Sequence, residues 1–93
     1  MIESTVGAHL ANSIVGTTME LFYWRERGKE VDFVLRRGEQ VVAIEVKSGR
    51  GREAFPGMSA FDRAFAPQRK LLVGGQGVSL EEFLLTPVSH WLE

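Results

Sequence analysis

Two acidic residues interrupt the apolar runs of the segment EVDFVLRRGEQVVAIEVKSG, which spans residues 30–49. Asp32 and Glu45 stand where a β-strand more often carries Val or Thr, and Lys47 follows Glu45 by two positions. Carboxylate oxygens are the ligands that Mg²⁺ accepts. A divalent ion would polarise a phosphate and lower the pKa of a water, and an ammonium group would orient that water or stabilise developing charge. These residue types therefore suit phosphodiester hydrolysis.

The segment is typical of a β-hairpin, and its turn determines where the two acids lie. If Gly38 and Glu39 are the central residues of a type II′ turn, paired residue numbers sum to 77, which places Asp32 opposite Glu45. A four-residue loop keeps this register, whereas a three-residue loop breaks it. Alternation along the strands puts Asp32, Glu45 and Lys47 on one face. The other face is expected to carry Val31, Phe33, Leu35, Val42, Ile44 and Val46.

Two facing carboxylates need a compensating interaction. Their β-carbons would lie about 5 Å apart, and their repulsion would be roughly 3 kcal/mol if both were ionised. One acid could be protonated, Lys47 could neutralise the pair, or a divalent cation could lie between them. The residues alone leave these arrangements open. A plain cross-strand ion pair on a solvated strand is the non-functional alternative.

Hydrophobic spacing and turn residues indicate the elements that would position these side chains. Helices are expected at residues 2–16, from Pro56 to just before Pro67, and after a capping box formed by Ser79 and Glu82. Strands are expected at residues 20–26, 31–37, 41–47 and in the stretch KLLVGG, the last of them buried and parallel to its neighbour. Through the fourth strand the order is α-β-β-β-α-β, which predicts an α/β fold.

The composition fits a single globular domain. Its 93 residues are 44% hydrophobic and 25% charged, which is enough for one modest core. The first helix starts abruptly at Ile2, so we expect a piece of a longer chain. No apolar run is long enough to span a membrane and no signal peptide is visible, which favours a cytoplasmic protein.

Composition also limits the chemistry. The lack of cysteine excludes disulfides, thiolate metal sites and thiol catalysis, so a metal would be held by oxygen or by His9 and His90. We expect both histidines to be packed or solvated. A net charge of −1 provides no long-range field for a polyanion, although the basic residues are concentrated between Arg25 and Lys70.

The stretches VDFV and IEVKSG together resemble the D…(D/E)xK signature of the PD-(D/E)xK nuclease superfamily. Asp32, Glu45 and Lys47 stand at its three motif positions, and Val31 replaces the proline of the name. The resemblance implies a restriction-endonuclease-like core, a central mixed sheet flanked by helices with the order α-β-β-β-α-β. In that superfamily a glutamate on the first helix often joins the metal cluster, and Glu3 matches its position.

A narrower resemblance covers nearly the whole chain. The stretches IESTVGAHL, YWRERGKEVDFVL, IEVKSG and SLEEFL look like the uncharacterised nuclease-like domain at the C-terminus of many bacterial and archaeal AAA-type ATPases. This implies a single PD-(D/E)xK-like domain over residues 1–93. It also implies a longer parent chain, whose N-terminal ATPase domain would be a partner.

The resemblance implies a divalent-metal-dependent nuclease. Asp32 and Glu45 would hold Mg²⁺ or Mn²⁺, Glu3 would complete the shell, and Lys47 would position the attacking water or stabilise charge. The substrate would be nucleic acid, with DNA expected and bound weakly by the domain alone, and a homo-oligomer stays open. The alternative is a catalytically inactive nuclease-fold module for nucleic-acid binding or for assembly of an AAA-type ATPase.

Three of the charged residues have a second interpretation. Glu3 in the first turn of a helix is also a favourable partner of the helix dipole. Arg50 and Arg52 are either solvated or in contact with phosphate.

Overall fold

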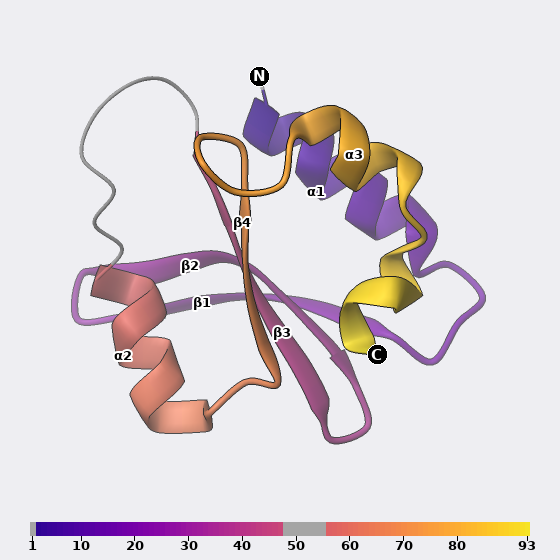
Figure 1. Ribbon diagram of the computed structural model, residues 1–93. Helices are drawn as coiled ribbons and strands as arrows, with labels where there is room; N and C mark the ends of the chain where they lie inside the picture. Colours follow the sequence, from indigo (N-terminus) through magenta and orange to yellow (C-terminus); the bar gives the residue numbers. More distant parts are fainter. Residues whose placement is uncertain (1, 48–55) are drawn as a thin grey trace.

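The computed structural model describes residues 2–47 and 56–93 of the chain. It is a small mixed α/β domain with one four-stranded sheet (Figure 1). In chain order the elements are α1 (Ile2–Ser13), β1 (Glu20–Glu26), β2 (Lys29–Arg37), β3 (Gln40–Val46), α2 (Pro56–Phe65), β4 (Arg69–Val73), α3 (Leu80–Leu85) and the 3₁₀ helix η1 (Val88–Leu92). The predicted order of helices and strands is confirmed, and η1 is an addition to it.

The sheet has the strand order β1-β2-β3-β4. β1, β2 and β3 form an antiparallel meander, and β4 pairs with β3 in parallel, as expected. Parallel neighbours need a crossover connection, and α2 lies within it. Because β1 is the first strand in this order, it forms one edge of the sheet (Figure 1). Within the described ranges, no helix is long and apolar enough to cross a membrane.

Helix α1 ends three residues earlier than expected, at Ser13 instead of Gly16. The hydroxyl of Ser13 donates to the carbonyl oxygen of His9 at 2.6 Å, and the N–H of Val15 donates to the carbonyl oxygen of Asn12 at 3.4 Å. Gly16 then adopts a φ of +77°. Side-chain bonds and tight i−3 bonds compete with the α-helical ladder, so they stop the helix early.

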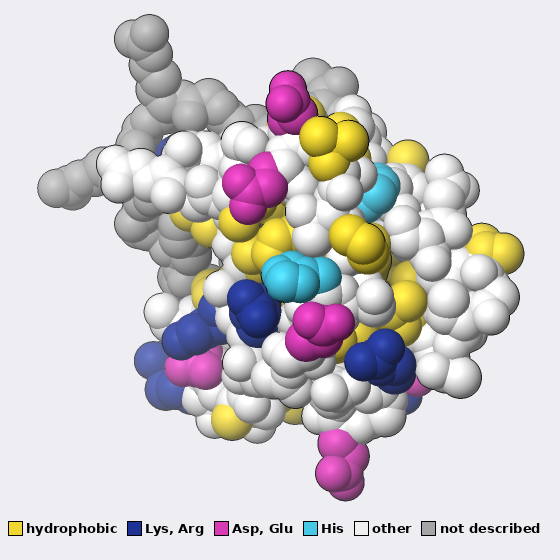
Figure 2. All heavy atoms as spheres, turned by 45° about the vertical axis from the view of Figure 1, so that its right-hand side comes forward, with side chains coloured by type: hydrophobic (Ala, Val, Ile, Leu, Met, Phe, Trp, Pro, Cys, Tyr) yellow, Lys and Arg dark blue, Asp and Glu magenta, His cyan; other side chains and the backbone are white. Residues whose placement is uncertain are grey.

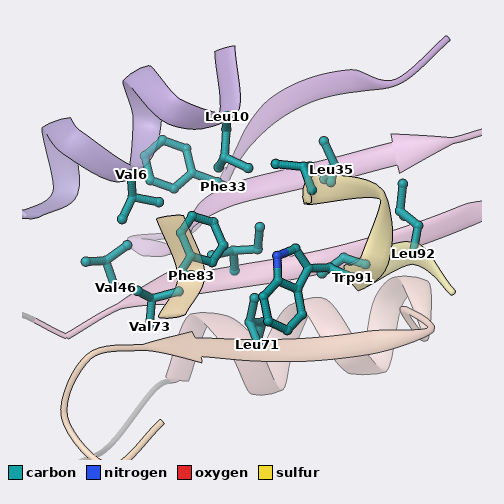
Figure 3. Close-up of a cluster of buried hydrophobic side chains, with 13 residues drawn as sticks. Val6, Leu10, Phe33, Leu35, Val46, Leu71, Val73, Phe83, Trp91 and Leu92 are labelled. Atoms are coloured by element: carbon teal, nitrogen blue, oxygen red, sulfur yellow. The ribbon is translucent and has the colours of Figure 1, made fainter. Parts of the chain in front are cut away.

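Apolar side chains pack on both faces of the sheet. One face is covered by α1, α3 and η1, and the other by α2 (Figure 1). Figure 3 shows the larger cluster, in which side chains from six elements point toward one another. Its buried members are Val6, Leu10, Phe33, Leu35, Val42, Ile44, Val46, Leu71, Val73, Phe83, Val88, Trp91 and Leu92. The smaller cluster comprises Val31, Val34, Ala43 and Phe61.

The C-terminal residues contribute to this core, although no element was expected there. Trp91 is 4% exposed and stacks on Phe83, with ring centroids 5.9 Å apart. The side-chain amides of Gln40 and Gln68 both donate to the carbonyl oxygen of Leu92, at 3.0 and 2.7 Å. These bonds fix η1 against the start of β3 and β4. On the outer surface of this side, acidic, basic and histidine side chains are interspersed (Figure 2).

Candidate functional site

The β2–β3 hairpin brings Asp32 and Glu45 to the same end of two paired strands. Backbone pairing runs over five residue pairs as far as Phe33↔Ile44, which confirms the predicted register. Gly38 has a φ of +62°, the conformation that the first central residue of a type II′ turn requires. The next pair in this register is Asp32 and Glu45.

At this next position the strands are joined by side chains instead of by backbone pairs. The N–H of Asp32 donates to Oε1 of Glu45 at 3.1 Å, and the N–H of Val46 donates to Oδ2 of Asp32 at 2.8 Å. Each carboxylate thus accepts a bond from the backbone of the opposite strand. Both residues are half-buried. Because a carboxylate has about four lone-pair positions, each of them can still bind a further donor or a cation.

A β-bulge re-orients this part of β2. Pairing between β1 and β2 shifts by one residue, so that Tyr23 alone lies opposite Asp32 and Phe33. An extra residue on one strand interrupts the alternation of side chains. Val31 was expected on the face of Phe33, but it packs with Phe61 of α2 on the other face. That prediction was wrong because simple alternation was assumed through the bulge.

Burial raises the pKa values of both acids, and the charge of Asp32 adds to the effect on Glu45. Partial burial, followed by the nearby Asp32 carboxylate, raises the pKa of Glu45 from 4.5 to about 7, against the lowering effect of the Asp32 N–H. Burial also raises the pKa of Asp32, although the N–H of Val46 opposes this. Near neutral pH the pair therefore favours a bound proton or a bound cation.

Glu3 comes toward the pair from the first turn of α1. Together with Asp32 it lines a depression of about 250 Å³, which we call the carboxylate depression and whose other residues are Tyr23, Trp24, Arg25, Glu30 and Val31. The charge of Glu3 also contributes to the raised pKa of Glu45. Its side chain is exposed, so its first-turn position suits the helix dipole as well.

Lys47 follows the last residue of β3, although the strand was expected to include it. Its backbone N–H donates to the carbonyl oxygen of Val73 at 2.8 Å, and the residue is half-buried. The action of its ammonium group beside the carboxylates stays a prediction. Arg50 and Arg52 lie outside the described residues.

The donors at this site suit a small hard cation, because carboxylate oxygens are the ligands that Mg²⁺ and Mn²⁺ prefer. In residues 2–47 and 56–93, no group of three His, Cys, Asp or Glu side chains is placed to hold a metal ion. Two carboxylates still fit Mg²⁺, which usually keeps several waters and is bound by one or two carboxylates together with substrate phosphates.

The two histidines make other contacts. His9 is half-buried and meets the ring of Phe83 edge-on, with centroids 5.4 Å apart. His90 is exposed, and its Nδ1 lies 3.5 Å from a carboxylate oxygen of Glu93. Both therefore agree with the expectation of packed or solvated histidines.

Sequence analysis missed two residues beside the acids. Glu30 is paired with Arg25 at 2.8 Å, and its charge adds to the raised pKa values of both acids. Tyr23 is 78% exposed, lies opposite the bulge and lines the carboxylate depression. The two-residue spacing from Asp32 could have indicated Glu30, because strand residues at that spacing lie on the same face. Tyr23 had no such signal.

The metal-free protein is expected to lose stability as the pH rises from about 5 to 8. Between pH 4.5 and about 7, the folded chain keeps a proton on Glu45 that the unfolded chain has released. The stabilisation by this retained proton is fully present below pH 4.5 and is lost as the pH rises through about 7. Because the group is only half-buried, we expect a loss of about 1 to 2 kcal/mol.

Urea unfolding in EDTA at a series of pH values measures this effect. Glu45→Gln should flatten the dependence of unfolding free energy on pH, because the amide does not titrate. A wild-type profile that this substitution leaves unchanged would contradict the raised pKa.

The comparisons with known proteins give one assignment. No curated protein and no solved structure matches the chain significantly. A family model matches residues 1–90, which is nearly the whole chain. The chain therefore belongs to the family described as "Domain of unknown function (DUF4143)".

Proposed function

We propose that the chain is a divalent-metal-dependent nuclease-like domain that hydrolyses phosphodiester bonds of nucleic acid. The observation that carries this proposal is the reciprocal bonding of Asp32 and Glu45 across the end of the hairpin. It holds two half-buried carboxylates together despite their repulsion, and the pKa of Glu45 rises to about 7. Titratable groups with such displaced pKa values are concentrated at functional sites.

The proposed core is restriction-endonuclease-like. In its support, the observed order α1-β1-β2-β3-α2-β4 combines an antiparallel meander with a parallel fourth strand. Glu3 belongs to α1, the first helix, where the superfamily resemblance places a glutamate, and the motif acids Asp32 and Glu45 belong to the paired strands β2 and β3. This support is an analogy at the level of the fold, so the function depends on the chemistry of the site.

Each side chain has a specific role in the proposal. Asp32 and Glu45 hold Mg²⁺ or Mn²⁺. Glu3, which is not grouped with them in the described residues, would complete the shell when the ion is bound. When bound, the ion polarises the phosphate and lowers the pKa of a water. Lys47 positions the attacking water or stabilises the charge that develops on the phosphoryl oxygens. Because the pKa of Glu45 is about 7, cation binding at neutral pH should release a proton from this residue.

A second candidate is a catalytically inactive module that binds nucleic acid or takes part in the assembly of an AAA-type ATPase. One observation favours it. Within the described residues, the bonded pair Asp32 and Glu45 has no third ligand group placed beside it to hold a metal ion. A metal held in this way would be weakly bound. This candidate shares the fold with the first and differs from it at the metal.

Calorimetric titration with Mn²⁺ tests the metal site. The wild type is expected to give a saturable heat for one ion, and Asp32→Ala is expected to abolish it. Glu39→Ala is a matched control because it removes an exposed acid at the other end of the same hairpin, and it should bind like the wild type. Titration at pH 7 in two buffers with different ionisation enthalpies would measure the proton that Glu45 releases. If the wild type gives no saturable heat, or if Asp32→Ala binds as the wild type does, the metal site is wrong.

A further inference from the structure

A groove with aromatic walls lies on the sheet face that α2 covers. Its volume is about 300 Å³, and its walls come from β1, α2 and the neighbouring strands. We call it the aromatic groove, and its aromatic residues are Phe22, Tyr23, Trp24, Phe61 and Phe65. Trp24 meets Phe61 and Phe65 edge-on, with ring centroids 5.4 and 6.3 Å apart. These contacts hold the rings in fixed positions.

Two of these rings, those of Phe22 and Phe65, are 40% and 56% exposed on the α2 face. Tyr23 is 78% exposed, but its ring lies 5.7 Å from that of Phe33, which packs on the opposite face, so Phe22 and Phe65 form the stacking surface. The guanidinium of Arg36 lies 5.2 Å from the centroid of the Phe22 ring. Exposed rings on two walls of one groove offer flat apolar surface that a planar ligand could cover.

A second depression, of about 310 Å³, shares Trp24 with the groove and carries cations. We call it the basic depression, and its charged residues are Glu26, Arg27, Lys29 and Arg63. Three cations against one anion leave a net charge of +2. A surface of this sign attracts phosphate groups.

The cations of the basic depression differ from their neighbours in having no ion-pair partner within the described part of the chain. Nearby, Arg25 is paired with Glu30 at 2.8 Å and Arg36 with Glu20 at 2.6 Å. The charges of Arg27, Lys29 and Arg63 are therefore available to an anionic ligand.

Tyr23 and Trp24 join these surfaces to the carboxylates. Both residues line the aromatic groove and the carboxylate depression, and Trp24 also lines the basic depression. The three surfaces thus meet at β1, which is an edge strand of the sheet (Figure 1). An extended ligand could pass around this edge from the α2 face to Asp32.

We propose that the aromatic groove and the basic depression bind a single strand of nucleic acid beside the carboxylates. Bases stack on the exposed rings, and phosphates pair with Arg27, Lys29 and Arg63. Aromatic stacking combined with a positively charged groove is how proteins bind single strands without sequence preference. A duplex keeps its bases stacked inside, so it could use only the cations. The inference rests on the proposed function for its class of substrate, but the binding itself needs no metal.

Fluorescence anisotropy tests the aromatic part of this inference. The probe is a labelled oligothymidylate of about 12 nucleotides, measured in EDTA at low salt beside a duplex of the same length. The wild type is expected to prefer the single strand. Phe65→Ala should lower single-strand affinity about 5- to 50-fold and leave duplex affinity unchanged. Leu85→Ala, which removes a 78% exposed apolar side chain from α3, should change neither.

The basic part is tested by the salt dependence of binding. Arg63→Gln should lower affinity for the single strand and reduce the slope of log K against log salt by about 0.7. Lys70→Gln is the control, because this lysine already pairs with Asp62 at 3.3 Å, and it should keep the wild-type slope. Circular dichroism melting curves would show that each variant is folded.

Several results would overturn the inference. Equal affinity of the wild type for both probes, or unchanged single-strand affinity in Phe65→Ala, would do so. The same holds if Phe65→Ala binds nucleic acid normally but loses self-association in sedimentation, since a second copy would then cover the groove. Single-strand binding that fails while Mn²⁺ still binds at Asp32 rejects only this inference, whereas intact single-strand binding without Mn²⁺ binding rejects only the metal-dependent function.

Discussion

Millimolar Mg²⁺ or Mn²⁺ is expected to raise the melting temperature of the wild-type protein. In the proposed function the ion binds the carboxylate pair of the folded chain, and the unfolded chain has no such site. At 100 times the dissociation constant the unfolding free energy rises by about 2.7 kcal/mol, which corresponds to roughly 10 to 20 °C for a domain of this size. Because protons compete for Glu45, the shift should be larger at pH 8 than at pH 6. Differential scanning fluorimetry with each ion measures it.

Asp32→Asn should abolish this shift while leaving the metal-free protein at least as stable. The amide oxygen of asparagine can still accept the bond from the N–H of Val46, and the repulsion between residue 32 and Glu45 disappears. Glu39→Gln should retain the full shift. A marked loss of metal-free stability in Asp32→Asn would identify Asp32 as a structural ion-pair partner. A melting temperature that neither ion moves in the folded wild type would rule out the metal site.

The carboxylate pair could be predicted from the sequence because it depends on short-range rules. Gly38 supplies the positive φ that a two-residue turn needs, and this turn fixes the register of the strands on either side. The observed pairing of Phe33 with Ile44 follows that register. The prediction that Asp32 and Glu45 lie side by side therefore required only the sequence of the hairpin itself.

Other features of the site arise from contacts between distant parts of the chain. The orientation of Val31 depends on how β2 pairs with Tyr23 of β1, and the sequence of β2 alone has no glycine to mark a bulge. The aromatic groove combines Phe22 of β1 with Phe65 of α2, which meet only when the crossover is made. Such juxtapositions follow from tertiary packing, so residue periodicity does not predict them.

Lys47→Ala is expected to lower the rate of nucleic-acid cleavage by about 100-fold or more while retaining metal binding. Lys47 comes directly after Val46, whose N–H is bonded to the Asp32 carboxylate. Loss of one group that stabilises charge on a reacting oxygen typically lowers the rate by roughly 10² to 10³. In the proposed function the cation is held by the carboxylates and not by Lys47, so calorimetric binding of Mn²⁺ should persist in this variant. Lys70→Ala is the control, because its lysine pairs with Asp62 on the surface.

Cleavage by the wild type is itself expected to be slow, favoured by Mn²⁺, and directed at single-stranded or nicked DNA at low salt. The chain has a net charge of −1, and its described residues place only three unpaired cations in the depression beside β1. Few phosphate contacts are therefore expected, so the affinity and the salt slope should be small. If Lys47→Ala cuts as fast as the wild type while Asp32→Asn does not cut, the metal site is right and the role of the lysine is wrong.

If the wild type binds Mn²⁺ but cuts no nucleic acid across substrates, ions and salts, and fusion to an ATPase domain does not restore cutting, the chain is a binding module. In that case the carboxylates hold a cation that neutralises bound phosphate without promoting its hydrolysis.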